Sequence, residues 1–212
     1  MKKKNRPSMV RFIIDLPNII SLLGLLCAVV GIYFAVLQIF YVAIIGVLWA
    51  VLFDWMDGLI AGKMKGRTED QKTFGGQLDS LIDIVSFGVL PAVILLSYAN
   101  FSLWFVPGAF ILVAGCGVRL SYFNTYGLTD GKSYTGLPVD SNGLIISFAF
   151  IFERLFSNGH FSVFLYILLI IVSVLNLSSI KIPKLSKNWI YAIAAYVLTL
   201  SIYFGGMLLN GN

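Results

Sequence analysis

The sequence predicts an all-α integral membrane protein, a polytopic bundle of six to seven transmembrane helices. Three observations point to this fold class. First, 58% of the 212 residues are hydrophobic and only 12% are charged. Second, the mean hydropathy of the chain is +0.89. Third, apolar runs of about 20 residues, the length that crosses a bilayer as a helix, recur along the whole chain and leave no polar half for a separate soluble domain.

Seven apolar runs are candidates for membrane spans. We expect them, in chain order, at 16–38, 39–62, 77–98, 103–123, 143–157, 161–178 and 189–209. The first is not expected to be a cleaved signal peptide, because a second span follows at once and no small-residue cleavage site ends it. The chain then divides into a basic N-terminal segment (1–15), a membrane domain (16–188) and an extra C-terminal span (189–212), for which the sequence suggests only a hydrophobic anchor.

Basic residues predict how the bundle is oriented. They gather at the N-terminus, in the loop 63–73, around Lys132 and in the loop 181–187. With seven spans these segments share one side of the membrane, and only Arg154 lies near the other. Because cytoplasmic loops are enriched in Lys and Arg, we expect a cell-membrane protein whose N-terminus and site face the cytoplasm. Anionic membrane lipid explains the net charge of +5 better than nucleic acid does, since no aromatic stacking platforms are interleaved with the basic residues.

Four carboxylates interrupt the apolar pattern. Asp54 and Asp57 lie near the end of the second expected span, and Asp79 and Asp83 lie near the start of the third. A charge at bilayer depth costs about 2.5–3.5 kcal/mol, so an uncompensated set of four would cost roughly 10 kcal/mol. Ionised carboxylates offer only acceptor oxygens, and the spacing of each pair puts both members on one helix face. The two faces together predict an oxygen-rich site for Mg²⁺ or Mn²⁺.

A zinc site is not expected. Cys27 and Cys116 lie in apolar runs, and the sequence has a single histidine, His160. No Cys-x-x-Cys pair or His/Cys cluster occurs, so the cysteines are interpreted as small hydrophobic residues.

The four aspartates belong to a longer motif. Residues 54–61 read Asp-Trp-Met-Asp-Gly-Leu-Ile-Ala, and residues 75–83 read Gly-Gly-Gln-Leu-Asp-Ser-Leu-Ile-Asp. These segments resemble the signature of the CDP-alcohol phosphotransferase family, DxxDGxxAR followed by GxxxDxxxD. Where the family has Arg after the Ala, this chain has Gly62 and then Lys63, which offers a positive charge one position along. The connecting loop is also longer, by about four residues.

A second pair of segments resembles one branch of that family, the CDP-diacylglycerol–serine phosphatidyltransferases. Residues 119–124, Arg-Leu-Ser-Tyr-Phe-Asn, and 134–139, Tyr-Thr-Gly-Leu-Pro-Val, are similar to the RLxxFN and FTGLP segments of that branch. The basic stretch 179–184 is similar as well. Asp140 is a departure, because the branch often continues with Pro and small residues, and this carboxylate could favour an acceptor that bears an amine without a carboxylate.

The resemblance implies an enzyme that transfers the phosphatidyl group of CDP-diacylglycerol to an alcohol, with L-serine favoured, and releases CMP. It implies two divalent ions, Mg²⁺ or Mn²⁺, held by Asp54, Asp57 and Asp79. Asp83 completes this metal-binding set and serves as the base that takes the hydroxyl proton. The nucleotide and its phosphates are expected at Asn18, Ser21, Asp54, Gly58, Ala61, Lys63 and Gly75. The acceptor or the lipid phosphate is expected at Arg119, Asn124 and Lys132. The family also implies a homodimer.

Simpler roles remain open for these residues. The aspartates could be hydrated residues at helix ends, favoured by the helix dipole in the case of Asp79 and Asp83. Arg119 and Lys132 could only set the topology. Helix packing or interhelical hydrogen bonds could account for Asn18, Ser21, Gly58, Gly75 and Gly76.

Two alternatives for the function are weighed against the serine transferase. One is the same chemistry with inositol phosphate, glycerol phosphate or choline as the acceptor. The other is a cation-coupled transporter, which also carries acids inside the membrane. Transporter acids should line a path through the bilayer and recur in later spans, often in repeated halves. Here they occur in two consecutive spans, which favours the enzyme.

Overall fold

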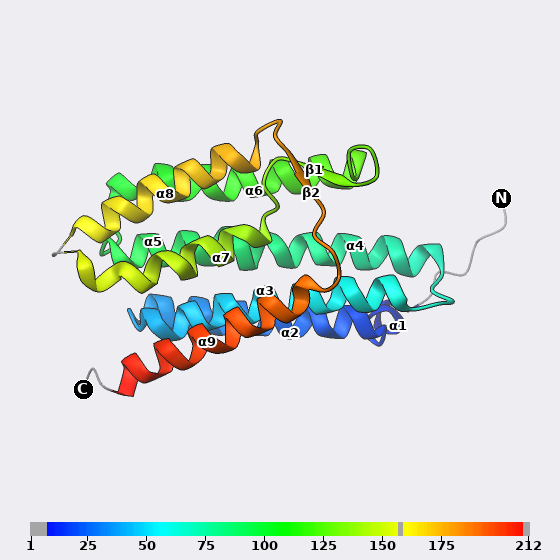
Figure 1. Ribbon diagram of the computed structural model, residues 1–212, viewed down its shortest axis with the longest axis horizontal. Coiled ribbons are helices and arrows are strands. Elements are labelled where there is room, and N and C mark those ends of the chain that lie inside the picture. The colour runs from blue at the N-terminus through cyan, green and yellow to red at the C-terminus, as the bar shows by residue number, and fades with distance from the viewer. Residues whose placement is uncertain (1–7, 157–158, 210–212) are drawn as a thin grey trace.

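Long helices run side by side along the molecule in the computed structural model, which describes residues 8–156 and 159–209 (Figure 1). Most of the basic residues predicted to anchor the N-terminus fall in 1–7, outside the described residues. The α-helices are α1 (Met9–Ile13), α2 (Leu16–Val36), α3 (Phe40–Lys63), α4 (Glu69–Asp83), α5 (Leu90–Tyr98), α6 (Val106–Tyr126), α7 (Asp140–Ala149), α8 (His160–Asn176) and α9 (Trp189–Leu209). The shorter elements are a π-helical turn (Ile84–Val89), 3₁₀ turns (Leu103–Phe105 and Phe150–Leu155) and the strands β1 (Ser133–Thr135) and β2 (Lys181–Pro183).

Five helical segments are long and apolar enough to cross a membrane: Leu16–Val36, Phe40–Lys63, Glu69–Tyr98, Leu103–Tyr126 and Trp189–Leu209. The predicted span 161–178 is also helical, as the 17-residue α8. The predicted span 143–157 corresponds to α7 and the 3₁₀ turn after it, and it is the shortest of the seven segments. These segments confirm the predicted all-α polytopic fold.

The third predicted span begins earlier than its apolar run suggests. It was expected at residue 77, but the helix starts at Glu69, because Thr68 caps it. The Thr68 side chain accepts from the Gln71 backbone N–H, while the Gln71 side chain accepts from the Thr68 backbone N–H at 2.9 Å. This capping box adds a polar first half to α4, which hydropathy alone does not reveal.

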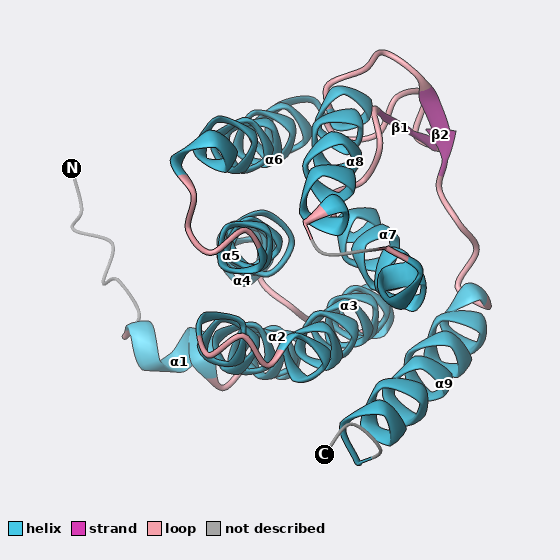
Figure 2. Ribbon diagram, turned by 90° about the vertical axis from the view of Figure 1, so that its left-hand side faces the viewer, coloured by secondary structure: helices cyan, strands magenta, loops and turns pink. Residues whose placement is uncertain are grey.

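The continuous column of α4, the π-helical turn and α5 lies at the centre of the bundle. Figure 2 shows it nearly end-on, with α2, α3, α7, α8 and α6 around it. α9 stands outside this ring and packs against α3. Phe87 is fully buried in the column, and its backbone carbonyl accepts from the Asn142 side chain at 3.2 Å and from Cys116 Sγ at 3.7 Å. These contacts tie the column to α6 and α7.

The π-helical turn follows Asp83 directly. Such turns leave backbone carbonyls free for other partners and often mark functional sites.

A two-stranded antiparallel sheet joins the α6–α7 connection to the α8–α9 connection. Tyr134 of β1 is paired with Ile182 of β2. Figure 1 places this small sheet in the half of the molecule that also holds the end of α3 and the start of α4, whereas the C-terminal end of α9 lies at the opposite end. The predicted loops 63–73, around Lys132 and 181–187 therefore share one half of the bundle.

Candidate active site

The two aspartate pairs meet between α3 and α4. One carboxylate oxygen from each of Asp54, Asp57 and Asp79 lies within 4.8 Å of the other two. The Asp83 side chain is within hydrogen-bonding reach of Asp54. Carboxylates repel one another at such distances unless a cation or a proton lies between them. The structure thus brings the four predicted aspartates together.

A small cavity of about 10 Å³ lies against this cluster. Its lining includes all four aspartates, together with Ser21, Gly24, Ala50, Ile82, Ser86 and Phe87. The Ser86 hydroxyl is buried and has no hydrogen-bond partner among the described residues. The space is about that of one water molecule or ion. Oxygen ligands at this separation, with an additional hydroxyl in need of a partner, fit a hard divalent cation such as Mg²⁺.

The aspartates also line a much larger cavity of about 950 Å³. Its walls come from α3, α4, α6, the segment 134–141, α7, the linker after β2 and α9. Polar and charged groups on these walls include Asp54, Asp57, Asp79, Ser80, Asp83, Arg119, Asn124, Tyr134, Asp140, Ser141, Lys184, Lys187 and Tyr196. A space of this volume accommodates a ligand the size of a nucleotide or a lipid headgroup.

Arg119 is a buried guanidinium in the wall of the large cavity. It is only 6% exposed, and its Cζ lies 5.2 Å from the ring centroid of Phe123 and 5.5 Å from that of Tyr134. Aromatic faces attract a cation but do not neutralise it. Among the described residues, its Nε has no hydrogen-bond partner and no ion pair includes its guanidinium. A buried cation without a counterion is costly, so this position suits an anionic ligand.

Tyr134 stays neutral beneath this guanidinium. Burial, followed by the negative charge of Asp140, raises the pKa of the Tyr134 hydroxyl. The ring therefore contributes a face and not a counterion.

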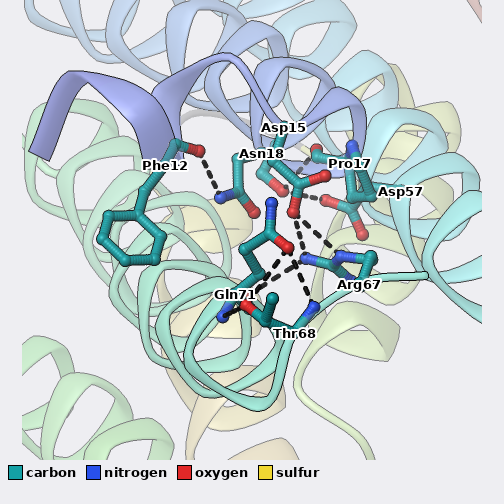
Figure 3. Close-up of polar contacts among 9 residues, drawn as sticks. Phe12, Asp15, Pro17, Asn18, Asp57, Arg67, Thr68 and Gln71 are labelled. Atoms are coloured by element: carbon teal, nitrogen blue, oxygen red, sulfur yellow. Dashed lines mark hydrogen bonds and ion pairs between the residues drawn. The ribbon is translucent and has the colours of Figure 1, made fainter. Parts of the chain in front are cut away.

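The side chain of a second arginine, Arg67, is buried and paired within the protein (Figure 3). Its Nε and Nη2 contact Asp15 Oδ2 at 2.8 and 2.7 Å, and Nη2 donates to the Gln71 carbonyl at 3.3 Å. The Arg67 and Asp15 side chains are 8% and 3% exposed. The pair joins the loop after α3 to the start of α2.

Glycine at position 75 is what leaves room for this ion pair. A Cβ there would lie 2.8 Å from Arg67 Nη2 and 3.0 Å from Asn18 Oδ1. Real Cβ atoms do not approach so closely, so any larger residue would displace the arginine or the asparagine.

Ser21 and Asn18 are also satisfied within the protein. The Ser21 hydroxyl donates to Asp57. The Asn18 Nδ2 donates to the Phe12 carbonyl at 2.8 Å (Figure 3). Ser21 lines the small cavity, while neither residue lines the large one. Their hydrogen bonds position the start of α2 and one aspartate.

The remaining predicted site residues differ in whether they line the large cavity. Gly58 lines the large cavity with open space around it, and Asn124 lines it while its Nδ2 donates to Ser80 Oγ at 2.9 Å. Ala61, Lys63 and Lys132 do not line it, and both lysines are exposed.

Sequence reasoning missed Arg67, Asp15 and Ser86. Some signal existed: Asp15 is a lone acid before the first span, and Arg67 is a basic residue in the lengthened loop. Nothing in the local sequence indicated that they pair.

Comparison with known proteins gives one consistent result. The family model for CDP-alcohol phosphatidyltransferases matches residues 14–201. The chain is similar to the archaetidylserine synthase of Methanothermobacter thermautotrophicus, with 37% identity over 174 residues, 81% of this chain and 70% of that protein. It is 31% identical to the CDP-diacylglycerol–serine O-phosphatidyltransferase of Methanocaldococcus jannaschii over 195 residues, 91% of this chain and 86% of that protein. A protein of the same name from Helicobacter pylori is 24% identical over 177 residues, 81% of this chain and 73% of the relative.

Proposed function

The chain belongs to the CDP-alcohol phosphatidyltransferase family, and we propose that it transfers a phosphatidyl group from CDP-diacylglycerol to the hydroxyl of L-serine, releasing CMP. The family match over residues 14–201 confirms the resemblance carried by the aspartate motif and identifies a membrane transferase rather than a cation-coupled transporter. The names of the similar archaeal and bacterial proteins support serine as the acceptor.

The observation that carries the choice of acceptor is the buried guanidinium of Arg119 in the cavity that the aspartates line: among the described residues its Nε has no hydrogen-bond partner and it forms no ion pair. The serine carboxylate would give Arg119 a planar partner for two hydrogen bonds. Choline has no anionic group and would leave the cation uncompensated. Inositol phosphate and glycerol phosphate are anionic, and the acceptor panel described below separates them from serine.

The aspartates divide the chemical work. Asp54, Asp57 and Asp79 would hold two divalent ions, Mg²⁺ or Mn²⁺. When bound, such ions neutralise the diphosphate and stabilise the departing CMP. Asp83 is not one of the three carboxylates that lie within 4.8 Å of one another, and it accepts the serine hydroxyl proton. The serine oxygen forms a bond to the lipid-bearing phosphorus, the bond from that phosphorus to the bridging oxygen breaks, and the electron pair leaves with CMP.

The cytidine diphosphate has room along the motif residues. Gly58 presents open backbone to the large cavity, so a phosphate or sugar can approach the chain closely. Lys184 and Lys187, on the linker after β2, offer positive charge at the same cavity. Asn18, Ser21 and Gly75 act indirectly in this proposal: Asn18 holds the start of α2, Ser21 holds Asp57, and Gly75 leaves room for Arg67.

α7 and α9 supply the apolar part of the cavity wall. Leu144, Ile145 and Phe148 come from α7, while Ala192 and Ile193 come from α9. Apolar walls beside a phosphate site suit the hydrocarbon chains of the lipid substrate. In this proposal α9 is thus part of the substrate site as well as the hydrophobic anchor that the sequence suggested.

The orientation and assembly complete the proposal. The loops near the aspartates and the start of α1 lie in one half of the bundle (Figure 1), and Lys and Arg are concentrated in these loops. The positive-inside rule supports placing that half at the cytoplasmic face of the cell membrane, where water-soluble serine and CMP exchange. The family supports a homodimer.

The test measures CMP release by the purified protein with CDP-diacylglycerol and Mg²⁺ or Mn²⁺. L-serine, inositol phosphate, glycerol phosphate and choline are supplied separately at equal concentration. We expect release with serine alone. Release with another alcohol and none with serine would overturn the acceptor, and no release with any of them would overturn the reaction. Repeating the assay with an ether-linked CDP-lipid determines which lipid tails the enzyme takes.

A further inference from the structure

We propose that Asp140 binds the ammonium group of the acceptor amino acid, opposite Arg119, so that the site selects a zwitterion. This inference rests on the proposed function and deepens it by assigning the second charged group of serine. It reverses the expectation that Asp140 favours an amine without a carboxylate.

Asp140 is the first residue of α7 and lines the large cavity. Its Oδ2 accepts from the indole N–H of Trp55 at 2.9 Å. Trp55 follows Asp54 in α3, so the hydrogen bond holds Asp140 beside the aspartate cluster. No basic side chain pairs with Asp140 in the part of the chain that the structure describes. This carboxylate therefore has an unused capacity to bind a cation.

Arg119 and Asp140 share the cavity without touching. Arg119 comes from α6 and Asp140 from the start of α7, and both line the cavity that the aspartates line. They do not form an ion pair within 4.0 Å. Two opposite charges held apart across a cavity match a ligand that carries a carboxylate and an ammonium group. Serine has both, next to the hydroxyl that must reach Asp83.

The backbone on both sides of Asp140 is held too firmly for the gap to close. Gly136 has φ +74°, and its N–H donates to the Ile180 carbonyl at 2.9 Å. The Leu137 N–H donates to the Leu175 carbonyl at 2.9 Å. On the other side, the side chain of Asn142 is hydrogen-bonded to Phe87 and to Asn176. The separation of the two charges is therefore built into the fold.

The test compares acceptors that differ by one group. 3-Hydroxypropionate keeps the hydroxyl and the carboxylate of serine but lacks the ammonium group. We expect Asp140→Asn to lower kcat/KM for serine by about 10²-fold, mainly through KM, because a charged partner is lost from a buried site. The same variant should leave kcat/KM for 3-hydroxypropionate within about twofold of the wild-type value.

Controls separate this role from others. Asp130→Asn changes an exposed aspartate that pairs with Lys181 at 2.8 Å, and it should alter neither acceptor. Binding of Mn²⁺ and of CDP-diacylglycerol should persist in Asp140→Asn. An equal loss with both acceptors would overturn the ammonium site and make Asp140 a general part of the metal centre.

A second variant keeps the proposal testable if Asp140→Asn does not fold. Trp55→Phe removes the indole N–H that orients Asp140, and it should raise the serine KM several-fold while sparing 3-hydroxypropionate. Unchanged preference for serine in both variants would overturn the inference. If the wild-type enzyme does not use serine at all, the proposed function fails instead, and the two failures are thereby distinguished.

Discussion

Arg67 and Arg119 both have buried guanidinium groups, and the surroundings of these groups differ. Arg67 is enclosed by protein acceptors: a carboxylate from the start of α2 and a carbonyl from α4. Arg119 rests on two aromatic rings, with its Nε unpartnered. Both side chains are largely buried, so exposure does not distinguish the two arginines. They differ in that Arg67 has a carboxylate of the protein as its ion-pair partner and Arg119 does not.

This difference separates structural charge from ligand-binding charge. A guanidinium that is neutralised inside the fold fixes elements in place, and replacing it should damage stability. A guanidinium that has no ion-pair partner within the fold favours binding of an anionic ligand, and replacing it should damage that binding. The aspartates also differ from one another. Asp57 is held by a hydrogen bond from Ser21, whereas Asp83 is not one of the three carboxylates that lie within 4.8 Å of one another.

Removing the metal should have the largest effect on activity, because the proposed reaction depends on the ions that the aspartates would hold. Chelation should abolish CMP release, and added Mg²⁺ or Mn²⁺ should restore it. Asp57→Asn should lose Mn²⁺ binding and turnover together, since a carboxylate ligand is replaced by a weaker amide. Full activity in chelator would contradict the metal-dependent account of the cluster.

Arg67→Ala should lower the free energy of unfolding by about 3–5 kcal/mol, because it leaves Asp15 buried without a partner. Thermal unfolding in detergent, compared with the wild type, measures the loss. Lys63→Ala is the matched control, since Lys63 is basic, near in sequence and exposed, and it should change stability very little. If Lys63→Ala proves the more damaging change, the comparison of the two arginines breaks down.

Asp83→Asn should reduce kcat by about 10²-fold or more while CDP-diacylglycerol and Mn²⁺ still bind. The reason is that an amide of the same shape cannot accept the hydroxyl proton. Single-turnover CMP release together with Mn²⁺ binding separates the two properties. A parallel loss of Mn²⁺ affinity would make Asp83 another metal ligand and leave the base unassigned.

Gly75→Ala should have the smallest of these effects, a loss of about 1–3 kcal/mol, because the added methyl group pushes on Arg67. Gly76→Ala is the control one residue along, with nothing within 4 Å of the added atom. In the middle of a helix that change should be neutral or slightly stabilising. Equal losses in the two variants, measured by thermal unfolding, would show that Arg67 is not held as described.

The sequence was sufficient to predict the fold class and the meeting of the aspartates. Apolar length determines helices that cross a bilayer, and the motif around Asp54 and Asp79 is local to two consecutive helices. What it did not predict depends on side chains far apart in the chain. Arg67 pairs with a residue 52 positions away, and the Trp55 indole reaches Asp140, 85 positions on.

The missing family arginine illustrates the limit. Sequence reasoning assigned its charge to Lys63, the nearest basic residue, and that assignment stays a prediction. In the fold Lys63 is exposed, while Arg67, in the longer loop, pairs with Asp15 at the start of α2. The distance of a loop residue from the motif in the sequence does not predict where its side chain lies in the fold. That position depends on the residue with which the side chain pairs.

The most direct test of the account is the acceptor preference of an Arg119→Met variant, which keeps apolar bulk over the two rings and removes the cation. The measurement is kcat/KM for L-serine and for ethanolamine, which has the same hydroxyl and amine but no carboxylate. We predict a loss of about 10²-fold or more for serine, little change for ethanolamine, and stability at least equal to that of the wild type. Equal losses for both acceptors, or a loss of stability like that of Arg67→Ala, would contradict the claim that Arg119 is reserved for the acceptor carboxylate.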